Sequence, residues 1–265
     1  MTSGPHPDLA SQVRAALAAR ADPERAAGQQ RYMKSAMPYV GLTSPALKGV
    51  LTPLLRDPGL AMESRAQWEA TIRELWDDAT HREEWYAAIA LARHRPYRAW
   101  VDSDAMPLWE SLIRAGAWWD VVDDIATHLV RDTVLAHPTI ESLRMRDWAG
   151  SDSLWVRRAA IICQVGAGVR LDQSLLADVI EPNIDDPDFF SRKAIGWALR
   201  DHARVDPEWV RAFVAAHPDL SGLSRREALK HLGAAPARTT ERTTERTTER
   251  TTGRTTAQAL PGTPS

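Results

Sequence analysis

The chain has 265 residues, of which 44% are hydrophobic and 26% are charged, as in globular domains with a sizeable core. Its single cysteine, Cys163, excludes an internal disulfide and a multi-cysteine metal site. A formal net charge of −2 gives no global signature of nucleic-acid binding, and no apolar run reaches the ~18–20 residues that a membrane span needs. The N-terminus lacks a secretory pattern, so we expect a cytoplasmic protein that makes no membrane contact.

Residues 1–235 read as helices nearly throughout, because alternating strand patterns and Asn-Gly or Asp-Gly hairpin turns are absent from their sequence. Four helix starts combine a capping residue with a following proline, at Asp22-Pro23, Ser44-Pro45, Asp186-Pro187 and Asp206-Pro207. About a dozen helices of roughly 10–16 residues fit between such signals. We expect the adjacent acids at 77–78 and 83–84 to be solvated.

An internal repeat of 35 residues favours an α-solenoid over a globular helical fold. Four helical segments align, beginning at Arg82, Ala117, Asp152 and Asp186. Three series of positions keep the interval of 35: Ala88, Asp123, Arg158 and Lys193; Glu84, Trp119, Leu154 and Phe189; Ala92, Thr127, Ile162 and Trp197. The predicted fold class is therefore all-α, a solenoid of HEAT-like helical hairpins with a concave groove.

The repeat places a strip of chemically active side chains on one surface, since the same helix of every repeat lines that surface. Trp119 and Asp123 are four apart and share a helix face. Arg158 occupies the equivalent place on the next repeat, and Lys193 and Trp197 follow on the one after. The core-facing stripe of the middle helix is predicted to be 118, 122, 125 and 129, so neither Trp119 nor Asp123 is needed for packing.

Such a strip suits a ligand that is anionic along a backbone and cationic at a reacting centre. Aromatic faces attract cations and stack on bases, while Arg and Lys hold phosphates. A carboxylate stabilises a developing positive charge or orients a water. DNA that carries an N3- or N7-alkylated purine has these properties, and cleavage of its glycosidic bond leaves an oxocarbenium-like sugar.

Four segments carry a resemblance to a known family. Residues 32–34 and 38–42 (YMK and PYVGL), 118–123 (WWDVVD), 155–158 (WVRR) and 193–200 (KAIGWALR) resemble, in order and spacing, motifs of the DNA alkylation repair family, the AlkD-type DNA glycosylases. The resemblance covers residues 25 to about 232. It implies a HEAT-like fold and a monofunctional glycosylase that removes cationic bases such as 3-methyladenine and 7-methylguanine from duplex DNA, without a metal or cofactor and as a monomer.

By motif position, the resemblance implies that Asp123 is the catalytic carboxylate and that Trp119 and Trp197 contact the lesion. It implies DNA contacts for Arg158, with Lys193 a candidate phosphate contact and Tyr32 and Lys34 candidate supports at the end of the groove. Enzymes of this family are thought to act without drawing the base into a deep pocket, unlike glycosylases that flip it.

Each site residue has a structural alternative. Trp119 and Trp197 could be packing residues, the latter beside Gly196, which allows a neighbour to approach closely. Asp123 could be an intramolecular partner of Arg158, or a solvated acid. Arg158 could bridge repeats, which would leave Arg157 as the contact to DNA. We expect Trp155 and Cys163 to pack in the core.

Two broader observations bear on function. From residue 238 the chain repeats RTTE, which has no apolar residue to bury, so we predict a disordered low-complexity tail at 236–265. That tail holds five Arg and three Glu, which leaves residues 1–235 with a net charge of −4. A DNA-binding groove is usually basic, although Arg93, Arg95 and Arg98 form a local cluster. The alternative is a non-catalytic HEAT-like scaffold that binds DNA structures or a protein.

Overall fold

The computed structural model describes residues 4–233, and the predicted tail at 236–265 lies outside the described residues. The described part is helical, with no strand in it. Its α-helices are α1 Leu9–Ala18, α2 Pro23–Met33, α3 Ser44–Arg56, α4 Arg65–Asp77, α5 Arg82–Ala92, α6 Met106–Gly116, α7 Trp119–Asp124, α8 Arg131–Ala136, α9 Pro138–Ala149, α10 Leu154–Ile162, α11 Gln173–Ile180, α12 Phe189–His202, α13 Pro207–Ala216 and α14 Gly222–Ala228. Short helical turns are η1 Pro58–Leu60, η2 Arg95–Trp100, η3 Ser103–Ala105, η4 Ile125–Val130, η5 Gly168–Arg170 and η6 Glu181–Asn183.

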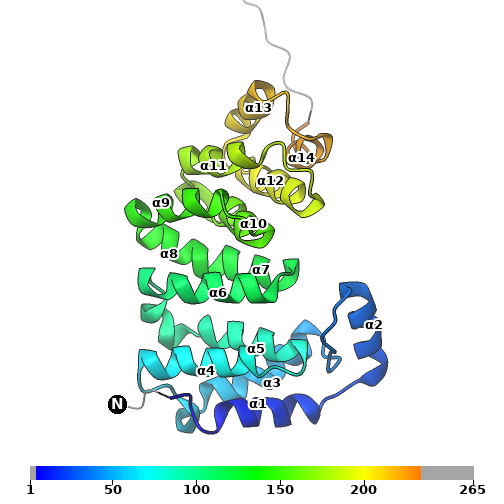
Figure 1. Ribbon diagram of the computed structural model, residues 1–265, viewed down its shortest axis with the longest axis vertical. Coiled ribbons are helices and arrows are strands. Elements are labelled where there is room, and N and C mark those ends of the chain that lie inside the picture. Colours follow the sequence, from blue (N-terminus) through cyan, green and yellow to red (C-terminus); the bar gives the residue numbers. More distant parts are fainter. Residues whose placement is uncertain (1–3, 234–265) are drawn as a thin grey trace, which may run out of the picture. The chain divides into compact units, whose positions relative to one another are not determined.

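From α4 onward the helices form successive antiparallel pairs that stack along the chain (Figure 1). The second helices of neighbouring pairs contact one another through side-chain bonds about one repeat apart. Arg158 on α10 reaches Asp123 on α7, and Lys193 on α12 reaches Glu227 on α14. These contacts confirm the predicted all-α solenoid and explain the repeat of 35, which is the length of one pair with its turns.

Most of the tryptophan excess packs the interior of this stack. Trp68 and Trp109 are fully buried, with ring centroids 5.8 Å apart in an edge-to-face arrangement. Trp76 and Trp85 stack at 4.8 Å. Each such ring removes roughly 150–250 Å² from water, so the packing interpretation holds for this group. Cys163 is also buried, as predicted.

The predicted helix starts are correct in two cases and shifted in two. Asp22 and Asp206 cap α2 and α13 as expected. The cap of α3 is Thr43, one residue before the predicted Ser44. The helix α12 is capped by Asp188 rather than Asp186, because the Asp186 carboxylate accepts the backbone N–H of Asp188 and forms a turn before the helix.

The acids at 83–84 were expected to be solvated, and this prediction was wrong. Glu83 is buried and accepts the backbone N–H groups of residues 40, 41 and 42 at 2.8–3.2 Å. Glu84 is buried against Arg14 at 2.7 Å. Both carboxylates find polar partners on other elements, which a sequence pattern does not reveal. The acids at 77–78 are exposed, as predicted.

The loop at residues 40–42, which Glu83 binds, fixes the position of α2. Gly41 adopts a φ of 101°, and a Cβ there would lie 2.1 Å from the carbonyl oxygen of Asp22. The Asp22 amide also donates to Val40 O at 2.9 Å. Only glycine fits this approach, so the PYVGL segment joins the start of α2 to α5. No described helix is long and apolar enough to span a membrane.

Candidate active site

The WWDVVD segment forms the N-terminal part of a helix that changes its winding midway. Trp118 caps α7, and α7 passes directly into the π-helical turn η4 and then into α8. Turns of π-helix are rare and occur often at functional sites. Thr127 in this turn donates its hydroxyl to the backbone oxygen of Asp123 at 2.7 Å. The irregular turn therefore begins just after the acid that the sequence singled out.

Asp123 is held by Arg158 in a two-pronged ion pair. Arg158 Nε donates to Oδ1 at 2.7 Å and Nη2 donates to Oδ2 at 2.8 Å. The third donor, Nη1, reaches the backbone oxygen of Phe190 on α12 at 2.7 Å. The Arg158 side chain is only 6% exposed, whereas that of Asp123 is 19% exposed. The pair thus leaves one edge of the carboxylate open while fixing its orientation.

The environment of Asp123 favours a less acidic carboxyl. Burial raises its pKa above the usual value, and the hydrogen bond and charge of Arg158 oppose that rise without cancelling it. A carboxylate that is partly desolvated interacts more strongly with a positive charge beside it than one in bulk water does. Arg158 therefore favours the ionised form of Asp123 at a site where burial favours the neutral acid.

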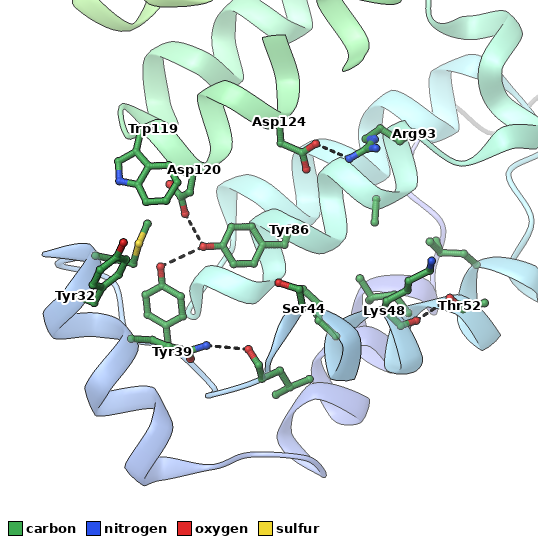
Figure 2. Close-up of a pocket in the computed structure, with 17 residues that line it drawn as sticks. Tyr32, Tyr39, Ser44, Lys48, Thr52, Tyr86, Arg93, Trp119, Asp120 and Asp124 are labelled. Atoms are coloured by element: carbon green, nitrogen blue, oxygen red, sulfur yellow. Dashed lines mark hydrogen bonds and ion pairs between the residues drawn. The ribbon is translucent and has the colours of Figure 1, made fainter. Parts of the chain in front are cut away.

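An open cavity of about 750 Å³ adjoins this helix. Trp119, Asp120 and Asp124 line it from α7, Tyr86 from α5 and Tyr32 from α2, and α3 contributes both apolar and polar residues. Figure 2 shows the labelled aromatic side chains on one side of the cavity and Lys48 and Thr52 on the other. Trp119 therefore lines this cavity, whereas Asp123, one turn further along the helix, is not among its lining residues.

A buried polar network builds the wall of the cavity, and the sequence did not reveal it. Arg82 donates to both oxygens of Asp120, and the Tyr86 hydroxyl donates to one of them. The hydroxyls of Tyr39 and Tyr86 lie 3.1 Å apart (Figure 2). Burial and the neighbouring Asp120 raise the pKa of Tyr86, so its phenol remains a donor. Arg82 and Asp120 are 38 residues apart, close to the repeat length, which is the only sequence signal for the pair.

The structure brings some predicted site residues together and leaves others apart. Asp123 and Arg158 are in direct contact, which is the intramolecular pair that the sequence left open. Arg158 is buried and bonds both Asp123 and Phe190 O, so it bridges repeats; its contact with DNA stays a prediction. Trp119 lies one turn before Asp123, half-buried and facing the cavity.

The remaining candidates occupy different surroundings. Trp197 is half-buried against the core on α12. Lys193 forms an ion pair with Glu227 at 2.8 Å, and Arg157 forms one with Asp186 at 2.9 Å. Tyr32 is 79% exposed at the cavity. DNA contacts for Lys193, Arg157 and Tyr32, and a lesion contact for Trp197, stay predictions.

Lys34 is exposed at the end of α2, where its φ is 51°. The residue terminates the helix in a left-handed conformation and lies outside the lining of the cavity. This position serves the turn into the PYVGL loop. Contact with DNA stays a prediction.

The predicted core stripe of α7 is correct for three of its four members. Val122, Ile125 and Leu129 are buried. Trp118 is half-buried ahead of the helix, where its ring contacts Trp155 and Phe190 at centroid distances of 5.8 and 5.4 Å. The Phe190 ring lies beside the Asp123–Arg158 pair, since the Arg158 guanidinium carbon is 5.9 Å from the ring centroid of Phe190.

No group of His, Cys, Asp and Glu within residues 4–233 has the geometry to hold a metal ion. The acids of the site are instead matched by arginines: Asp120 by Arg82 and Asp123 by Arg158. The arrangement supplies one fixed carboxylate, an indole one helical turn before it and an open cavity that this indole lines.

Comparison with known proteins adds to this geometry. The family model of the DNA alkylation repair enzyme matches residues 13–232. The chain belongs to the DNA alkylation repair enzyme family. A solved structure described as a predicted DNA alkylation repair enzyme from Enterococcus faecalis is 28% identical, with a TM-score of 0.70, and the match covers 81% of this chain and 98% of that one. No match was found among curated proteins.

Family membership confirms the resemblance carried by the four motifs. Three of them lie at the centre of the site: residues 118–123 contribute Trp119 and Asp123, residues 155–158 contribute Arg158, and the PYVGL loop places α2 at the edge of the cavity. The residues 193–200 form the middle of α12. The family assignment establishes DNA repair as the setting in which this geometry acts.

Proposed function

We propose that the protein is a monofunctional DNA glycosylase that removes positively charged alkylated purines, such as 3-methyladenine and 7-methylguanine, from duplex DNA. The observation that carries this proposal is the Asp123 carboxylate, fixed by Arg158 at 2.7 and 2.8 Å and open on one edge. The family of DNA alkylation repair enzymes supports the choice of substrate.

The reaction needs little more than a well-placed negative charge. As the bond between C1′ and the base nitrogen breaks, its electron pair leaves with the cationic base, which becomes neutral, and positive charge develops on the sugar. Asp123 stabilises that charge, and it can accept a proton from the water that adds to C1′. The products are the free base and an abasic site. The indole face of Trp119 attracts the cationic base electrostatically.

Arg158 acts in this scheme as a positioning residue. Its pair with Asp123 fixes both carboxylate oxygens and opposes the effect of burial on the pKa. Because the guanidinium also donates a hydrogen bond to Phe190 O, the position of the carboxylate is fixed relative to three helices, α7, α10 and α12. Such fixed orientation removes the need to reorganise charge during the reaction.

The test uses methylated duplex DNA and two variants that remove one carboxylate each. Asp123→Asn should lower base release by about 10²–10³-fold while the affinity for unmodified duplex stays within about twofold. Asp77→Asn, an exposed acid on α4, is the control and should leave base release unchanged. A wild-type protein that binds duplex but releases no methylated base would instead support the non-catalytic scaffold.

A further inference from the structure

A second, smaller hollow lies next to the catalytic helix and concentrates positive charge. Its volume is about 210 Å³, and arginines at 93, 95 and 98 line it together with His128 and Asp132. The remaining lining residues are Ala92, Val101 and Leu129. We call this hollow the Arg95 cleft. It lies where α5 ends and η2 begins, opposite η4 and the start of α8.

The acids near this cleft are already paired, which leaves Arg95 unpaired and Arg98 only distantly paired. Asp124 forms an ion pair with Arg93, and its carboxylate lies 2.9 Å from His128 Nδ1. Asp132 accepts from Arg131 at 2.9 Å and lies 3.9 Å from Arg98, whose side chain is 78% exposed. Arg95 is exposed and forms no ion pair with an acid of residues 4–233. A small concave surface with an unpaired guanidinium group at Arg95 and an exposed one at Arg98 is suited to an anion.

Side-chain contacts connect the Arg95 cleft to the helix turn that carries the Asp123 carboxylate. Asp124 follows Asp123 in the helix, and its carboxylate contacts two residues that line the cleft. Arg93 lines both the cleft and the large cavity beside Trp119. An anion bound in the cleft therefore lies beside side chains that contact Asp124, the residue next to Asp123.

We propose that the Arg95 cleft binds one phosphodiester group of the DNA strand, and so fixes the register of the duplex against Asp123. The inference rests on the proposed function, because it takes duplex DNA as the ligand. A cleft of about 210 Å³ has room for a phosphate group. The Arg95 cleft also explains how a domain with a net charge of −4 contacts a phosphate group.

The test measures the binding of unmodified duplex by fluorescence anisotropy over a range of salt concentrations. Arg95→Gln/Arg98→Gln should make the slope of log K against log salt shallower by about 0.9, the value for one phosphate. At about 0.1 M salt this corresponds to an affinity about eightfold lower, taking 1 M as reference. Arg95→Lys/Arg98→Lys retains the charge and should retain most of the slope.

The control is Arg20→Gln/Arg73→Gln, which removes the same charge at two exposed positions that line neither hollow. An unchanged slope in the Arg95→Gln/Arg98→Gln variant, or an equal loss in the control, overturns the proposal. Calorimetry with inorganic phosphate separates the sources of the anion. If wild type binds phosphate, the Gln variant does not, and both bind duplex equally, the cleft is a free-anion site and the DNA assignment is wrong.

The two proposals fail in different ways. A wild-type protein that binds duplex but releases no base refutes the proposed glycosylase activity, while the salt dependence of duplex binding can still be measured. Normal base release at saturating DNA, together with an unchanged slope, refutes only the phosphate assignment.

Discussion

Replacing Arg158 by Met should destabilise the protein in a pH-dependent way. The substitution removes three hydrogen bonds and leaves the Asp123 carboxylate without its partner in a site that is 19% exposed. Breaking a buried ion pair by removing one partner costs about 3–5 kcal/mol, and the open edge of Asp123 places the expected cost near the lower end, about 3 kcal/mol. For a domain of this size, that lowers Tm by about 6–12 °C at pH 7.

The sign of the pH effect follows from the direction of the pKa shift. Burial already raises the pKa of Asp123, and both influences that lower it come from Arg158, so Arg158→Met raises it further. A carboxyl whose pKa is higher in the folded state than in the unfolded state binds a proton more tightly when folded. The penalty is therefore full at pH 7 and shrinks as the pH falls toward the unfolded pKa of about 4.

Thermal unfolding at pH 7 and pH 5 measures this difference, and the pH profile of base release should show an acid limb moved to higher pH. The matched variant is Arg157→Met, which removes the neighbouring guanidinium from Asp186 and leaves Asp123 paired. Its acid limb should stay where the wild type has it. An Arg158→Met penalty equal at both pH values would refute the account of Asp123.

Three glycine substitutions test the packing of the backbone, two at crowded positions and one at an open position. Gly41→Ala should lower the free energy of unfolding by several kcal/mol, since its Cβ would lie 2.1 Å from Asp22 O at a φ of 101°. Gly28 lies in the middle of α2 with open space around it, so Gly28→Ala should raise the free energy of unfolding by about 1 kcal/mol. Gly196→Ala should cost about 1–3 kcal/mol, because its Cβ would lie 2.4 Å from Cβ of Glu227 on α14. Denaturant unfolding measures all three, and a Gly41 variant as stable as the Gly28 variant would contradict the assigned loop geometry.

The sequence alone determined the fold class and the positions that meet between repeats. The interval of 35 residues aligned Asp123 with Arg158, and the structure places these two side chains in contact. The separation of Trp119 and Asp123 from the core stripe also follows from helix periodicity alone. Gly196 was expected to allow close approach, and Glu227 does pack against it. Each of these features depends on spacing along a regular helix, which sequence records directly.

Tertiary structure decided which polar groups are buried and what they contact. Glu83 and Glu84 looked like solvated acids, yet one holds the PYVGL loop and the other holds Arg14. The Asp120 network, the π-helical turn and the Arg95 cleft likewise arise where separate elements meet. A charged residue has the same sequence signature whether water or a distant backbone solvates it. Only the packing of the chain decides which of the two it contacts.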